Sequence, residues 1–267
     1  MKDGMKNFDI INVVGMAYRK TWEERAYLLR MAAIPFLVKL ACFTILASYF
    51  EGESLFMTAV VLLPSFIVEG WFLAHWARTI MTGGVHRWPF RVSGNEIKDR
   101  MELLSRGRGI MAGMVAFALI NFMIIGYMAG LFSGMPDISE GFDPQNPDPR
   151  VAVVGVVFMV TSMLLFRFIW VHIPLSINVP IEKIFQILQP MKLTFRMVAV
   201  WMICVIPAFL LIQMLGEVLV GASGEATPIT QTGFMVIRIV IEMVKNLIVT
   251  AGMGYVFLVL LQSSEKK

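Results

Sequence analysis

Six apolar segments constrain the fold of this chain more than any other feature of its sequence. They cover residues of about 31–50, 56–78, 110–132, 151–171, 197–219 and 240–262. Each segment is long enough to cross a hydrocarbon core of about 30 Å as a helix. The segments are continuously apolar and do not alternate as the strands of a closed barrel would, which leaves helices as the spanning elements. The sequence therefore predicts an all-α polytopic membrane helix bundle, with residues 1–267 as a single integral membrane domain.

Composition agrees with this class. Hydrophobic residues make up 57% of the chain and charged residues 16%, against roughly 45–50% and 25% in soluble domains. The net charge of +4 is spread over many short segments, and no soluble domain presents it as one basic surface, so nucleic acid is not an expected partner. The expected partners are membrane lipids, and other integral membrane proteins or a second copy of the chain.

Basic residues are distributed unevenly between the connections. The N-terminal segment, residues 78–108, residues 172–196 and the C-terminal tail hold eighteen Lys and Arg, whereas the three opposite connections hold only Arg150. Cytoplasmic loops of membrane proteins carry such an excess of Lys and Arg. The asymmetry predicts a multi-pass protein with both termini in the cytoplasm.

Three short segments on the cytoplasmic side have narrow apolar stripes at helical spacing. They cover residues of about 8–21, 94–105 and 179–190. Each is too short to span the bilayer, so we expect three separate amphipathic helices that lie in the interface. Because each segment precedes a pair of spans, the chain has a three-unit pattern. Either a true internal repeat or the ordinary tendency of inner loops to lie on the bilayer accounts for it.

Two stretches of the sequence carry a resemblance to known proteins. They are "WFLAHWARTIMTG" with the following "WPFRVSGNEIKDRM", and "FIWVHIPLSINVPIEKIFQILQPMKLTFRMVAVWM". They resemble a diffuse group of uncharacterised six-span bacterial inner-membrane proteins, similar in outline to the membrane domain found beside some glycerophosphodiester phosphodiesterases. The residues that carry the resemblance are Trp76, Arg78, Gly83, Arg91, Glu96 and Pro174. The resemblance implies a bacterial inner membrane as the location and implies no catalytic residue.

Motifs for catalysis or for cofactors are absent from the sequence. The chain contains no Gly-rich phosphate loop, no His-Glu pair of the zinc-protease type and no serine elbow. His75, His86 and His172 have no second ligand at helical spacing, so we expect no metal site. The sequence therefore predicts neither a cofactor nor an enzyme, although a membrane-embedded lipid enzyme stays open as an alternative.

Ionisable residues inside the predicted spans are the sharpest functional signal, because they are costly there and usually face the bundle interior. Three of them have simple explanations: Arg167 can snorkel, Glu217 lies near the end of its span, and Glu242 has helical salt-bridge spacing to Arg238 near the outer boundary. The residues that are left define a candidate intramembrane polar site: Lys39, Glu69, Lys245 and Asn246.

Lys39 and Glu69 are predicted to form an ion pair. Lys39 lies nine residues beyond Arg30, and Glu69 lies nine residues before Arg78, so both are about 13–14 Å from the same end of their spans. Only a few residues join the two spans, which makes them antiparallel neighbours. The alternative is a snorkelling lysine without a partner.

Three functions fit these observations. The first is a non-enzymatic scaffold, assembly factor or accessory subunit that binds other membrane proteins or lipids. The second is a transporter of ions, lipids or other small molecules, with a pathway lined by Lys39, Glu69, Lys245 and Asn246. The third is the lipid enzyme, which requires paired polar residues at one interface. The absent motifs and short loops favour the first.

Overall fold

The computed structural model describes residues 8–50, 54–83, 96–133, 149–223 and 228–264, and this part of the chain is helical without any strand. Six stretches of it are long and apolar enough to cross a membrane, which confirms the predicted fold class. The α-helices are α1 (Ile10–Glu23), α2 (Arg25–Tyr49), α3 (Leu55–Met81), α4 (Glu96–Ser133), α5 (Pro149–Leu165), α6 (His172–Leu175), α7 (Ile181–Leu188), α8 (Met191–Ser223) and α9 (Pro228–Ser264), with the 3-10 turn η2 (Phe166–Phe168) between α5 and α6.

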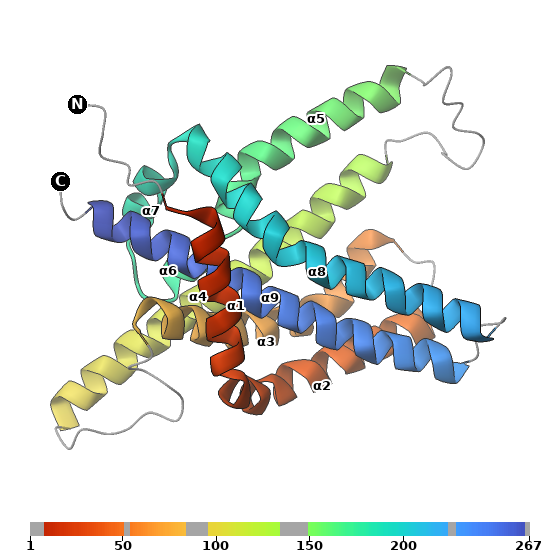
Figure 1. The fold of residues 1–267 in the computed structure, drawn as a ribbon, viewed down its shortest axis with the longest axis horizontal. Coiled ribbons are helices and arrows are strands. Elements are labelled where there is room, and N and C mark those ends of the chain that lie inside the picture. Colours follow the sequence, from red (N-terminus) through yellow and green to blue (C-terminus); the bar gives the residue numbers. More distant parts are fainter. Residues whose placement is uncertain (1–7, 51–53, 84–95, 134–148, 224–227, 265–267) are drawn as a thin grey trace.

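The long helices run between two ends of the bundle (Figure 1). The C-terminal end of α9 lies at the same end as α6 and α7, and we call this the terminal end. At the opposite, distal end, α2 is followed by α3 and α8 is followed by α9. This arrangement agrees with two of the predicted hairpins, α2 with α3 and α8 with α9.

Helix α1 lies across the spans, in front of α9 (Figure 1). The carboxylate of Asp9 caps it by accepting a hydrogen bond from the backbone N–H of Ile11 at 3.0 Å. Its buried face, formed by Val13, Val14 and Ala17, packs on α9 and α8. The helix predicted near residues 8–21 therefore forms, and the face that holds Val13, Val14 and Ala17 contacts protein, whereas Ile11 of the apolar stripe is exposed.

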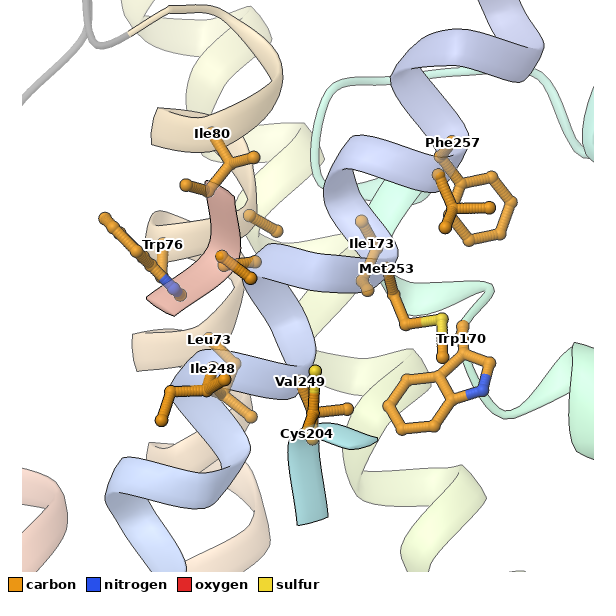
Figure 2. Packing of buried hydrophobic residues seen from close by; sticks show 14 of the residues in the cluster. Leu73, Trp76, Ile80, Trp170, Ile173, Cys204, Ile248, Val249, Met253 and Phe257 are labelled. Carbon is orange, nitrogen blue, oxygen red and sulfur yellow. The ribbon is translucent and has the colours of Figure 1, made fainter. Parts of the chain in front are cut away.

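The hydrophobic core surrounds α9. Figure 2 shows Leu73 and Trp76 of α3 on one side of this helix, and Trp170 and Ile173 on the other side. Met253 and Val256 of α9 are fully buried. Each large apolar side chain buried in such a core stabilises a protein in water by about 1.5–3 kcal/mol; in a bilayer, close packing carries more of the stabilisation. The best-packed part of the molecule is therefore near the terminal end.

The predicted interfacial helix at residues 94–105 is not a separate element. It is the first part of α4, which continues without interruption from Glu96 to Ser133. Glycines at positions 107 and 109 would favour a break, but α4 contains no proline, and Gly109 serves a different purpose. A Cβ atom at Gly109 would lie 2.4 Å from the carbonyl oxygen of Ser176, so this glycine permits close packing on α6.

The predicted fourth span, residues 151–171, is also not one continuous α-helix. α5 ends at Leu165, and the chain continues through η2 into the four-residue helix α6. Pro174 and Pro180 prevent a regular helix beyond this point, because proline lacks a backbone N–H and restricts the residue before it. The third amphipathic helix does form as α7, which begins after Pro180 and ends before Pro190.

Candidate functional site

A buried network of charged and polar side chains joins α2, α3 and α9. The ammonium group of Lys39 donates a hydrogen bond of 2.9 Å to Oε2 of Glu69, which confirms the predicted ion pair. It also lies 3.3 Å from Oε1 of Glu242. The side-chain amide of Asn246 donates to Oε1 of Glu69 at 2.7 Å. Both carboxylate oxygens of Glu69 are therefore bonded within the bundle.

The side chains of this network differ in exposure. Those of Lys39 and Glu69 are each 5% exposed, whereas that of Glu242 is 33% exposed. With all three groups ionised, two carboxylates flank one ammonium group, and the network carries an excess of one negative charge. Transfer of such charges out of water costs several kcal/mol per ion, and only close pairing with additional hydrogen bonds offsets this cost. Removal of one charged member would therefore leave the opposite charge buried without its partner.

Close helix packing fixes the position of Glu69. A Cβ atom at the neighbouring Gly70 would lie 2.9 Å from the carbonyl oxygen of Met114 and 3.1 Å from Cβ of Phe117. α3 and α4 therefore approach each other closely beside the carboxylate. On α2, Lys39 points from a buried position one turn after the buried Pro35. Both partners of the ion pair come from helices whose backbones are held by their neighbours.

In α9, Glu242 contacts the buried network and Lys245 does not, which is the opposite of the prediction from the sequence. Glu242 belongs to the network, although its spacing favoured a pair with Arg238. Lys245 is half-buried and takes no part in the network's ion pairs and hydrogen bonds that the structure describes. With 3.6 residues per turn, Asn246 lies about 40° around the helix from Glu242, on the same face, whereas Lys245 lies about 60° to the other side. Glu242 and Asn246 therefore face the same side of α9, where both contact the network.

A second polar region lies along the terminal part of α3, which packs on α6 and on α9. Nη1 of Arg78 donates to the carbonyl oxygen of Ser176 at 3.0 Å, and Nε1 of Trp76 donates to that of Leu247 at 2.9 Å. The amide of Asn178, whose φ of 62° is left-handed, donates to the carbonyl oxygen of Ser105 at 2.8 Å. Here side chains donate to backbone carbonyl groups of α9, of α4 and of the irregular segment that contains α6.

Arg167, another charged residue of a predicted span, makes structural hydrogen bonds. Nη1 of Arg167 donates to the carbonyl oxygens of Leu188 and Gln189 at 3.0 and 3.1 Å. These carbonyls lie at the C-terminal end of α7, where a helix leaves its last carbonyl groups unpaired. Arg167 therefore caps α7, in place of the snorkelling that its position suggested. Glu217 is exposed near the distal end of α8.

The two described histidines, His75 and His172, each lie beside an aromatic ring. Among the described residues, no group of three or more His, Cys, Asp or Glu side chains is arranged to hold a metal ion. His75 and His172 are buried and lie edge-on to Trp71 and Phe117, respectively. His86, together with Arg91 of the resemblance, lies outside the described residues.

Comparisons with family models, with curated proteins and with solved structures gave no match for this chain. The resemblance to six-span bacterial inner-membrane proteins therefore stays a prediction from the sequence. Of its residues, Arg78 of α3 donates to the carbonyl oxygen of Ser176 beside α6, Pro174 lies within α6, and Trp76 of α3 donates instead to Leu247 of α9.

Proposed function

We propose that this protein is a non-enzymatic scaffold or accessory subunit of a bacterial inner membrane, which binds other membrane proteins or lipids. The observation that carries this proposal is the closed charge network. Lys39 is held by two carboxylates, and Glu69 uses both of its oxygens within the bundle. A pathway for transport requires polar groups that can exchange partners with a substrate. A network whose deeply buried members bond to one another instead fixes three helices together.

The proposed binding surface for a partner membrane protein includes α5. This helix and the distal part of α4 diverge from α8 and α9 (Figure 1). Large apolar side chains project from α5, among them Val153, Val156, Val157, Met159 and Val160, all of them exposed. In a bilayer these side chains contact either lipid or the helices of another protein. In a scaffold, such a surface binds the helices of another protein.

The proposed orientation places both termini and the terminal end of the bundle in the cytoplasm. The eighteen-to-one charge asymmetry supports this orientation. We expect a reporter that is active only outside the cytoplasm to work when inserted in the loop of residues 134–148, and to stay silent when fused to the C-terminus. The opposite pattern contradicts the orientation but leaves the fold unaffected.

Site-specific photo-crosslinking in native membranes tests the scaffold proposal. A crosslinking amino acid is placed at Val156 of α5, which is 57% exposed, or at Leu37 of α2, which is 62% exposed and serves as the matched control. We expect a discrete protein adduct from position 156, recovered in stoichiometric amount after purification in mild detergent, and lipid adducts alone from position 37. Lipid adducts alone from both positions contradict the proposal for α5.

One observation favours the transporter as the second candidate. Glu242 is the partly exposed member of the network, so the charges of the bundle interior reach its surface at this residue. The purified chain is reconstituted in liposomes that contain a pH-sensitive dye, and proton and sodium gradients are imposed in turn. A scaffold gives the same flux as empty liposomes. A flux that Glu242→Gln abolishes, with the fold retained, replaces the scaffold by the transporter.

A further inference from the structure

A groove of about 890 Å³ lies between α1, α2 and α9. Figure 1 shows α1 crossing α9 beside the beginning of α2, where the mouth of the groove is located. The walls come from residues 28–36 of α2 and 240–248 of α9. All of the wall residues are apolar: Leu28, Leu29, Ala32, Ala33, Phe36, Val240, Met243, Val244, Leu247 and Ile248.

The mouth of the groove is cationic and aromatic. Arg19, Trp22 and Arg25 line it. The guanidinium group of Arg25 lies 4.7 Å from the ring centroid of Trp22 and donates to the carbonyl oxygen of this residue at 3.0 Å. Neither contact neutralises the charge of Arg25. It therefore remains available to an anion at the entrance.

The acidic residues near the mouth neutralise only part of its positive charge. Arg19 pairs with Glu23 at 2.8 Å, and Lys20 pairs with Glu24 at 2.9 Å. Residues 19–25 thus carry three basic and two acidic side chains. Arg25 supplies the charge that is left over.

The length of the groove matches one leaflet of a bilayer. From Arg25 to Phe36 the helix α2 advances about 16 Å at 1.5 Å per residue, close to half of a hydrocarbon core of about 30 Å. On α2 the deep end of the groove is at Phe36, less than one turn before Lys39. The groove therefore ends near the buried charge network. A tryptophan at the entrance is typical of the level of lipid headgroups.

We propose that this groove binds a phospholipid with an anionic headgroup, whose phosphate contacts Arg25 and whose acyl chain lies along α2 and α9. The polarity of the site matches that of a lipid, because charge is confined to one end and the walls are apolar over the remaining length. This lipid site rests on the lipid-binding part of the proposed function and is separate from the protein-binding surface of α5, because α1, α2 and α9 form the groove. It assigns a defined lipid site to one face of the bundle.

Lipid titration followed by native mass spectrometry of the full chain tests the headgroup. The probes are phosphatidylglycerol and phosphatidylcholine with the same palmitoyl and oleoyl chains. We expect phosphatidylglycerol to bind at least fivefold more tightly, and Arg25→Gln to remove most of this preference. Arg100→Gln is the matched control, because Arg100 is exposed on α4 and lies outside the groove. Equal affinities for the two lipids, or an equal effect of the two substitutions, overturn the proposal.

A second pair of variants tests the walls. Ala33 and Ala41 are both exposed on α2, but only Ala33 lines the groove. We expect Ala33→Trp to weaken the binding of both lipids severalfold and Ala41→Trp to leave it unchanged. Unchanged lipid affinity in Ala33→Trp overturns the proposal, and a simultaneous change of oligomeric state assigns the groove to a second copy of the chain. Crosslinking from Val156 is unaffected by either variant, so the scaffold function stands or fails separately.

Discussion

The two buried polar regions of this bundle are built from different chemistry. The network around Lys39 consists of side chains that bond to side chains, and opposite charges supply its strength. The second region, along the terminal part of α3, consists of side chains that donate to backbone carbonyl groups of α9 and of the α6 segment, together with glycines that allow the backbones to approach. The first region connects regular helices, and the second accommodates an irregular segment. Loss of one charge should therefore damage the first region most, whereas added bulk should damage the second.

Removal of a single charge from the Lys39 network should have the largest effect. Lys39→Met leaves the carboxylates of Glu69 and Glu242 without their shared cation, and loss of one partner from a buried pair costs about 3–5 kcal/mol. The free energy of unfolding in mixed detergent micelles measures this effect. The double variant Lys39→Met/Glu69→Leu should recover much of the loss. If the double variant is no more stable than the worse single variant, the pair does not act as a unit.

Added bulk at the contact between α4 and α6 should have the next largest effect. In Gly109→Ala the new Cβ atom would lie 2.4 Å from the backbone oxygen of Ser176, and overpacking of this kind costs about 1–3 kcal/mol. Gly126→Ala on the same helix is the control, because a Cβ atom there contacts nothing within 4 Å. The same unfolding measurement compares the two variants. Equal stabilities contradict the close packing at Gly109.

Loss of one side-chain donor from the second region should have a smaller effect. Trp76→Phe keeps an aromatic ring in the core but removes the hydrogen bond to the carbonyl oxygen of Leu247. The net value of such a bond is about 0.5–1.5 kcal/mol. Trp22→Phe serves as the control, since Trp22 is 69% exposed. A loss as large as that from Lys39→Met would remove the distinction between the two regions.

The exposed ion pair between Arg19 and Glu23 should have the smallest effect and provides a baseline for both regions. The hydrogen bond from Arg19 lowers the pKa of Glu23 below its ordinary 4.5. A carboxyl group with a lowered pKa in the folded state adds stability above pH 4.5, and this stability is lost as the pH falls below that value. Because the pair is exposed, Arg19→Gln should change the unfolding midpoint at neutral pH very little, and the difference should vanish in acid. A difference from the unsubstituted chain that grows as the pH falls contradicts the assignment.

The ion pair of the first region could be predicted from sequence spacing, because a short connection fixes the relative depth of α2 and α3. Counting residues from Arg30 and from Arg78 places Lys39 and Glu69 at one level, and the two side chains meet there. Glu242 was missed because α9 has no short connection to either helix, so its depth and rotation depend on the packing of the whole bundle. The sequence placed Glu242 on one stripe of this helix with Asn246, but counting residues back from Gln262 assigned Glu242 to the outer boundary of the membrane.

The second region was missed because backbone acceptors carry no signal in the sequence. Arg78 marks the end of a span, and nothing in its neighbours indicates the carbonyl group of Ser176 as its partner. Likewise, a glycine at position 109 is typical of a break between two helices, whereas here it permits contact between two backbones. The helices themselves follow from local hydrophobicity and length, but the irregular segment between α5 and α7 follows from tertiary contacts.

The separation of the charged partners along the chain implies an order in which the membrane insertion of the protein proceeds. Lys39 and Glu69 are 30 residues apart, whereas Asn246 is 177 residues from Glu69. The two central charges of the first helical hairpin can thus enter the bilayer as a neutral pair. At a synthesis rate of about 5–20 residues per second, the last helix emerges roughly 10–35 s later. Throughout that interval one carboxylate oxygen of Glu69 lacks the hydrogen bond that Asn246 later donates.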